Sequence, residues 1–256
     1  MEFGYIIAGF IVGGLVGLTG VGGGSLMTPI LLLIFHIKPT FAVGTDLLYA
    51  SITKSVGIFA HGKLGNIDWK IVKLLAFGSI PASVCTILYL KNIDIDSSHA
   101  IDTIKFWLGI ALVITSVAVL LRNRLIASLK NDQWISDRYV GLSTILLGAI
   151  LGALVTLTSV GAGALGVTAL IMIYPHKKIT TIIGSDIAHA VPLTMVAGLE
   201  HAALGTINYG LLGTLLIGSI PGIYLGSHLS SKVSEHWVRI ALSAILIYVG
   251  FKLVLH

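Results

Sequence analysis

Long apolar segments with almost no charge follow one another along the whole chain, and they restrict its fold more than any other feature. Only 11% of the 256 residues are charged, whereas soluble domains carry about 25%. A helix of about 20 apolar residues is long enough to cross a bilayer. Because backbone polar groups in lipid must be paired within the protein, the sequence predicts an all-α, polytopic integral membrane protein.

Ten apolar segments are expected, five in each half of the chain. Those of the first half span 4–19, 24–37, 40–61, 69–90 and 101–121. Those of the second half span 139–157, 163–175, 179–201, 207–228 and 235–255. We therefore expect a first membrane repeat, 1–121, a basic cytoplasmic linker, 122–137, and a second membrane repeat, 138–256. The two repeats together are expected to form one transport domain.

The two halves resemble each other at a constant offset of 140 residues. Starting from Gly44 and Gly184, 13 of 38 aligned positions are identical. A shared apolar bias does not place Asp, His and Pro in one register, so the sequence predicts a duplication. The most informative identities are Asp46/Asp186, His61/His201 and the Gly-Ser-Ile-Pro strings at 78–81 and 218–221.

The distribution of Lys and Arg predicts how the repeats are oriented. If the first two segments of each half form a hairpin that returns to its own side, eleven of these residues lie on one face and four on the other. If those segments form one broken crossing, the numbers are eight and seven. Since Lys and Arg concentrate on the cytoplasmic face, we favour inverted repeats with both termini outside. The hairpins, re-entrant or fully spanning, would meet near the midplane.

Glycine-rich breaks interrupt the apolar sequence at corresponding places, 19–25 and 158–164. Paired breaks of this kind point to the binding site of a transporter, although small residues also serve close helix packing. A helix that begins at such a break presents free N–H groups and a partial positive charge, which suits an anion. Substrate-binding candidates in and around the breaks, within the third segment, or at the proline kinks of the fourth segments are Thr19, Gly22, Gly23, Gly24, Ser25, Thr28, Lys54, Ser79, Thr158, Ser159, Gly161, Gly163 and Ser219.

Ionisable residues within the apolar segments are the second group of candidates, because burying them in a membrane is costly. Lys54 either adds a cation to the anion site, pairs with an acid, or extends toward the membrane surface. Asp46 and Asp186 either cap helices or take up protons during transport, and His189 is a proton-relay candidate. No spacing of His, Asp or Glu matches a metal site, and no cofactor is expected.

The chain resembles the TauE/SafE family of sulfite exporters and toluene-sulfonate permeases. The resemblance is carried by the string Gly17–Ser25 with Pro29, by Ala42–Thr45, and by His61-Gly62 with Gly65. It extends over nearly the whole chain, and the second copy at 158–221 is weaker. The resemblance implies a multi-pass carrier of sulfur-containing or organic anions. The chain departs from the family pattern at Asp46 and Asp186, where a small hydroxyl residue is favoured.

These observations predict a secondary transporter that moves a small oxyanion, such as sulfite or a sulfonate, by alternating access. The alternatives are a passive anion channel and a cation- or proton-coupled carrier of another solute. An enzyme is not expected, because no nucleophile and base converge. The expected partners are a small anion, membrane lipid and a coupling proton or sodium ion, with a homodimer as one option. Nucleic acid is excluded by the lack of a basic stripe. The expected location is the plasma membrane of a bacterium or an archaeon.

Overall fold

The computed structural model describes residues 2–19, 26–60, 67–92, 98–128, 136–229 and 235–255. Within these ranges the chain forms ten helices and no strand, so the predicted all-α fold is confirmed. The helices are α1 (Glu2–Thr19), α2 (Met27–Leu33), α3 (Pro39–Ala60), α4 (Trp69–Lys91), α5 (Ser98–Ser128), α6 (Asp137–Thr158), α7 (Ala164–Ile173), α8 (Ile179–Ala203), α9 (Tyr209–Leu229) and α10 (Glu235–Leu255).

Five of these helices are long and apolar enough to cross a membrane, so the protein is a multi-pass membrane protein. The crossing segments lie in α4, α5, α6, α8 and α9. Their outer surfaces carry large apolar side chains, such as Phe77, Ile150 and Ile217, which are 73%, 63% and 66% exposed. In water such surfaces would be unfavourable, whereas lipid tails are as apolar as the side chains themselves.

Most helices begin and end within a few residues of the predicted segments, with two informative differences. The helix α2 covers only seven residues of the predicted segment 24–37. It ends before His36, whose φ of 53° turns the chain, and Pro39 then occupies the first position of α3, where proline is favoured. The helix α5 continues to Ser128, so part of the predicted linker 122–137 is helical. No glycine or proline occurs from 111 to 140 that would end it earlier.

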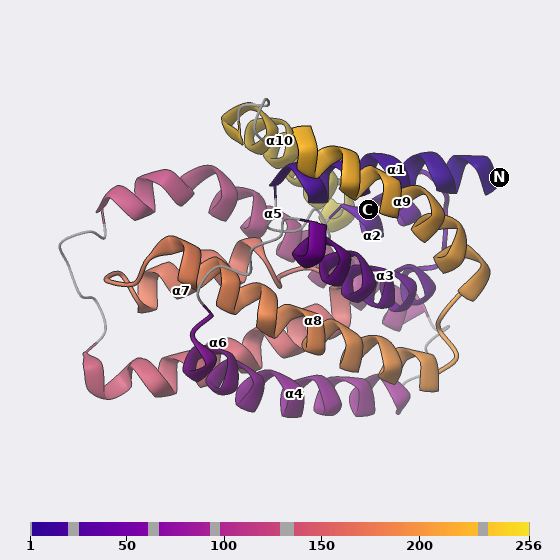
Figure 1. Ribbon diagram of the computed structural model, residues 1–256. Helices are drawn as coiled ribbons and strands as arrows, with labels where there is room; N and C mark the ends of the chain where they lie inside the picture. Colours follow the sequence, from indigo (N-terminus) through magenta and orange to yellow (C-terminus); the bar gives the residue numbers. More distant parts are fainter. Residues whose placement is uncertain are drawn as a thin grey trace.

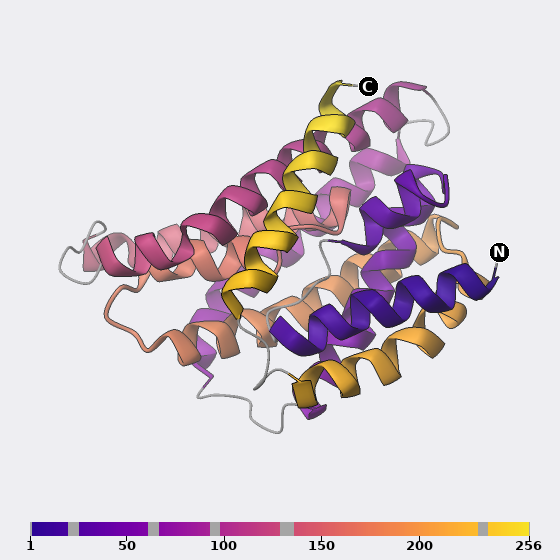
Figure 2. The same cartoon turned by 90° about the horizontal axis from the view of Figure 1, so that it is seen from above.

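The helices are arranged in pairs that combine the two halves of the chain (Figure 1). The pair α1 and α9 lies along one side, the pair α4 and α6 along the opposite side, and α3 and α8 lie between them. The helices α5 and α10 pack against each other and are best seen from above (Figure 2). Each of these pairs takes one helix from each half, so neither half packs as a separate domain.

Glycines allow the outer pairs to pack with their backbones in contact. A Cβ atom on Gly218 of α9 would lie 2.0 Å from the carbonyl oxygen of Ile6 on α1. In the same way, a Cβ atom on Gly78 of α4 would lie 2.0 Å from the carbonyl oxygen of Ile145 on α6. Gly78 and Gly218 are counterparts at the offset of 140, so both halves use the same small-residue packing.

Two pairs of corresponding helices, α3 with α8 and α5 with α10, pack antiparallel. In the pair of α3 and α8, Gly44 lies against His201, whereas Ser51 donates a hydrogen bond to the carbonyl of Val191. An increasing residue number on α3 thus meets a decreasing number on α8. The pair of α5 and α10 is antiparallel as well, as the contacts Gly109–Val254 and Ser116–Ser243 establish.

Candidate functional site

The glycine-rich break of the second half forms an abrupt start for α7. Ser159 ends α6 in the left-handed region with φ of 58°, and Gly161 and Gly163 have φ of 126° and 122°. Such values favour glycine. The hydroxyl of Thr158 accepts a hydrogen bond from the Val160 amide at 3.1 Å and donates to the Leu154 carbonyl at 2.6 Å. Thr158 and Gly161, both predicted to bind substrate, therefore contribute to the shape of the break.

The corresponding break of the first half is described only at its end, where α2 begins. Thr28 lies in the first turn of α2 and is fully buried. Its amide donates a hydrogen bond of 3.1 Å to Oδ2 of Asp46 on α3, and its hydroxyl donates to the same oxygen. The Asp46 carboxylate thus lies at the start of α2, where free N–H groups are available.

Asp186 occupies the corresponding place at the start of α7. Its carboxylate is fully buried and lies beside the amide of Gly163, the residue that precedes α7. A Cβ atom on Gly166 would lie 2.0 Å from Oδ1 of Asp186, so only glycine leaves room for the carboxylate there. Neither carboxylate oxygen has a hydrogen-bond partner. Each half-helix therefore begins next to a buried aspartate from the helix that follows it.

Lys54 lies between the two aspartates. It belongs to α3, two turns after Asp46, and only 9% of it is exposed. Its Nζ atom donates a hydrogen bond of 3.1 Å to the carbonyl of Ala162, in the break before α7. It attracts the carboxylates of Asp186 and Asp46 without a direct ion pair to either. Lys54 thus points into the bundle and is the cation shared by both acids.

Two further polar contacts place aromatic side chains beside these residues. Nε2 of His189 lies 2.7 Å from the hydroxyl of Ser79, between α8 and α4. The hydroxyl of Tyr49 donates a hydrogen bond of 2.9 Å to Ser219, between α3 and α9. At the offset of 140, Tyr49 corresponds to His189 and Ser79 corresponds to Ser219, so the two contacts are equivalent in the two halves. Tyr49 is not among the residues predicted from the sequence, although its alignment with His189 identifies it.

Asp46, Lys54, Ser159, Asp186 and His189 form what we call the central cluster. The hydroxyl of Ser159 lies beside the Asp46 carboxylate, and Lys54 interacts electrostatically with both acids and with His189. Five buried polar atoms of the cluster have no hydrogen-bond partner: Oδ1 of Asp46, Oγ of Ser159, both carboxylate oxygens of Asp186 and Nδ1 of His189. Such atoms are rare in proteins, and their concentration here makes the central cluster the candidate functional site.

Most of the predicted site residues that the structure describes converge on this cluster. Thr28, Ser79 and Gly163 contact its members directly, and Ser219 is joined to α3 through Tyr49. The remaining candidates of the first break, Gly22, Gly23, Gly24 and Ser25, lie outside the described residues, and Thr19 is described only by its place in α1. In the described part of the chain, no group of three or more His, Cys, Asp or Glu side chains could hold a metal ion.

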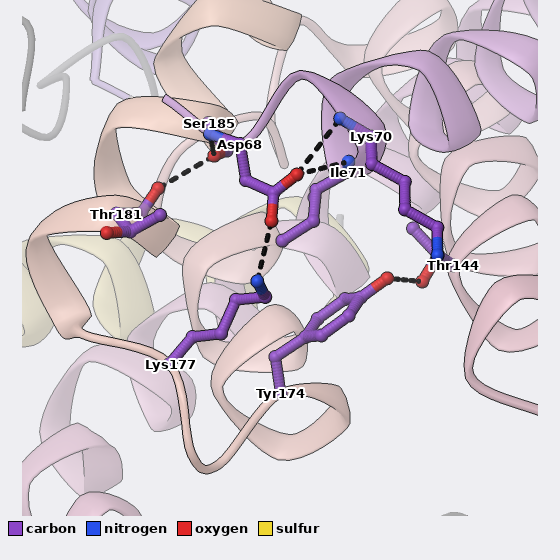
Figure 3. Close-up of polar contacts among 8 residues, drawn as sticks. All are labelled: Asp68, Lys70, Ile71, Thr144, Tyr174, Lys177, Thr181 and Ser185. Carbon is purple, nitrogen blue, oxygen red and sulfur yellow. Dashed lines mark hydrogen bonds and ion pairs between the residues drawn. The ribbon is translucent and has the colours of Figure 1, made fainter. Parts of the chain in front are cut away.

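A second polar cluster, which the sequence analysis did not predict, joins three elements near the start of α4 (Figure 3). The carboxylate of Asp68 caps α4 and forms an ion pair of 2.6 Å with Lys177, in the turn between α7 and α8. The Asp68 amide donates a hydrogen bond of 2.9 Å to Ser185 of α8. In the same region, the hydroxyls of Tyr174 and Thr144 are 2.8 Å apart. The hydrogen bond from Lys177 holds the pKa of Asp68 below its usual range.

Broken helices and buried charges at the centre of a membrane-spanning bundle are the architecture of a membrane transporter. The model of the family described as sulfite exporter TauE/SafE matches residues 5–253. The chain therefore belongs to the TauE/SafE family, as its resemblance at Gly17–Ser25 predicted.

The relatives of the chain are named as membrane transporters. The chain is 40% identical to the probable membrane transporter protein YjnA of Bacillus subtilis, over 99% of this chain and 100% of that protein. It is 34% identical to the probable membrane transporter protein MJ0441 of Methanocaldococcus jannaschii, over 98% of this chain and 94% of that protein. No solved structure matches the chain significantly.

Proposed function

We propose that the protein is a secondary transporter that carries a small oxyanion, such as sulfite or a sulfonate, through the central cluster. The observation that carries this proposal is the position of Lys54. Its ammonium group lies inside the bundle and reaches the break before α7, where the amide of Gly163 also lies. A buried cation next to the start of a helix provides both a charge and oriented N–H donors for an anion.

Alternating access requires two arrangements of similar energy, which inverted repeats provide. The antiparallel crossing of α3 with α8, and of α5 with α10, supports the inverted relation that the distribution of Lys and Arg predicts. Repeats related in this way place the substrate at their interface. The central cluster fits that position because its ionisable members come from α3 in the first half and from α8 in the second. In this arrangement both termini lie on the outer, non-cytoplasmic face of the plasma membrane.

A carrier of cations is the second candidate, because the cluster contains two carboxylates and only one lysine. The unpartnered oxygens of Asp46 and Asp186 are hard oxygen ligands of the kind that sodium prefers. Under this alternative Lys54 would compete with the transported cation for the carboxylates. Replacing Lys54 would then preserve or increase transport, whereas the loss of an anion-binding lysine decreases it. The two candidates thus predict opposite effects of one substitution.

The test is a counterflow experiment with purified protein in proteoliposomes. Vesicles loaded with unlabelled sulfite or a sulfonate are diluted into the same labelled anion, and uptake is compared with that of vesicles loaded with chloride. We expect stimulated, saturable uptake in the wild type and a decrease of at least about tenfold in Lys54→Gln, since a buried charge pair is worth more than 1.4 kcal/mol. The matched control is Lys73→Gln, because Lys73 is exposed on α4.

Three results would contradict the proposal. If none of the oxyanions is exchanged, the protein is not an oxyanion carrier. Flux that does not saturate and is not stimulated by internal anion would indicate a channel. Transport of sodium that persists in Lys54→Gln, without exchange of any anion, would favour the cation carrier.

A further inference from the structure

We propose that each monovalent anion crosses the membrane together with one proton, in an electroneutral symport set by Asp46, Asp186 and Lys54. This inference rests on the proposed transport of an oxyanion. It adds the coupling ion, its stoichiometry and the groups that carry the charge. Its basis is the balance of charge in the central cluster.

The cluster has three charged positions among the described residues. Asp46 and Lys54 come from α3 and Asp186 from α8, while His189 of α8 and Tyr49 of α3 are the other titratable groups that face them. A charged His189 ring would bury an unpaired N–H at Nδ1, since only Nε2 has a partner, the hydroxyl of Ser79. Tyr49 keeps its proton and donates a hydrogen bond to Ser219. Both side chains are therefore counted as neutral. The other contacting groups are the uncharged side chains of Thr28, Ser79, Ser159 and Ser219. With both acids ionised, the net charge of the cluster is therefore −1.

An uncompensated charge in this place is costly. Both carboxylates are fully buried, and removing an ion from water costs several kcal/mol if it is not paired. Asp46 receives two hydrogen bonds from Thr28, whereas Asp186 receives none with full hydrogen-bond geometry. The proton that neutralises the empty cluster therefore resides on Asp186, and Asp46 remains ionised opposite Lys54. The net charge of the empty carrier is then zero.

Binding of a monovalent anion beside Lys54 changes this balance by one negative charge. A second proton from the water on the side of entry then forms an O–H bond with an oxygen of Asp46. The loaded cluster, with two protonated acids, one ammonium and one anion, is again neutral. When the anion leaves on the other side, that O–H bond breaks and the proton passes to water. One anion and one proton thus cross per cycle, and neither the loaded nor the empty carrier moves net charge.

The experiment uses the wild-type protein in proteoliposomes with a radiolabelled sulfonate, whose charge stays −1 over the pH range of the assay. The membrane potential is fixed with valinomycin and potassium, and the pH gradient is set independently. At zero potential, we expect the anion to accumulate about tenfold for each unit of the pH gradient. The reason is that, in a one-to-one symport at equilibrium, the free energy stored in the anion gradient equals the free energy of the proton gradient. A potential of either sign without a pH gradient should produce no accumulation.

Two outcomes separate failure of the inference from failure of the proposed function. Counterflow that occurs while accumulation follows the potential or a sodium gradient overturns the symport and leaves the oxyanion carrier intact. Absence of counterflow for every anion overturns both. The double variant Asp46→Asn/Asp186→Asn should lose its response to the pH gradient and respond to the potential, since its empty cluster is positive. Asp102→Asn, a change at an exposed position of α5, is the matched control.

Discussion

The contact between α1 and α9 gives a prediction whose size follows directly from the structure. The substitution Gly218→Ala places a Cβ atom 2.0 Å from the carbonyl oxygen of Ile6. Ordinary contact begins at 3.4 Å, so the two helices must separate by about 1.4 Å, which is overpacking worth roughly 1–3 kcal/mol. Phe10 and Gly14 of α1 also lie against α9, so a shift of α1 at Ile6 disturbs these contacts as well.

The matched control is Gly213→Ala, on the same helix. No atom lies within 4 Å of a Cβ atom at Gly213, and alanine favours a helix over glycine by about 1 kcal/mol or less. The two variants thus make the same chemical change with opposite expected signs.

The assay is equilibrium unfolding in mixed micelles of dodecylmaltoside and SDS, followed by tryptophan fluorescence. We expect the midpoint of Gly218→Ala at a lower SDS fraction than the wild type, and that of Gly213→Ala equal to it or higher. A difference of 1–3 kcal/mol corresponds to roughly a 5- to 150-fold change in the unfolding constant. Equal midpoints for the two variants would refute the close backbone contact between α1 and α9.

Three further predictions concern the polar clusters. Gly166→Ala would displace the Asp186 carboxylate, since a Cβ atom there lies 2.0 Å from Oδ1. The rate of counterflow should therefore fall roughly tenfold or more. Gly141→Ala is the control, because a Cβ atom at Gly141 has open space around it, and its counterflow should equal that of the wild type. Thr28→Val removes a hydrogen bond to Asp46 and should lower the free energy of unfolding in SDS by about 1.5–3 kcal/mol. Thr168→Val removes only a hydrogen bond within α7 and should lower it less. The reverse order would contradict the pairing of Thr28 with Asp46. Lys177 lowers the pKa of Asp68 in the folded protein. At any pH above the ordinary pKa of an aspartate, the ion pair therefore stabilises the fold in full. This stabilisation is lost as the pH falls through the lowered pKa of Asp68 in the folded state. Lys177→Met should therefore cost up to about 1 kcal/mol at neutral pH and nothing in strong acid, and a cost that persists in acid would exclude the ion pair as its cause.

The sequence was sufficient for the order and type of the elements, because hydrophobic segments of membrane length are strongly restricted. It did not predict that α2 ends before His36 or that α5 continues to Ser128. The first depends on a left-handed turn at a residue other than glycine. The continuation of α5 depends on the absence of a helix-breaking residue from its charged end. Because that end is polar, the sequence predicts a linker there.

The central cluster was predictable in part, because its members are ionisable residues inside apolar segments. Asp46, Asp186, Lys54 and His189 stood out for that reason alone. What the sequence could not establish is that the aspartates lie at the starts of α2 and α7. The pairing of Thr28 with Asp46 joins residues 18 positions apart, and that of Asp68 with Lys177 joins segments from different halves. Contacts of this kind depend on how helices cross, and hydrophobic patterning does not determine that.

The inverted arrangement that we propose does not make the two ends of the bundle chemically equal. Thr144 and Tyr174, which share a hydrogen bond, align at an offset of 139 with Tyr5 and Phe35, whose rings pack 4.6 Å apart. Because α3 and α8 run in opposite directions, these contacts lie at opposite ends. The end with Asp68 and Lys177 is held by partly exposed polar groups, which salt screens, whereas aromatic packing resists salt. The two ends are therefore held by contacts of different chemistry, and only the ion pair of Asp68 with Lys177 should weaken as the ionic strength rises.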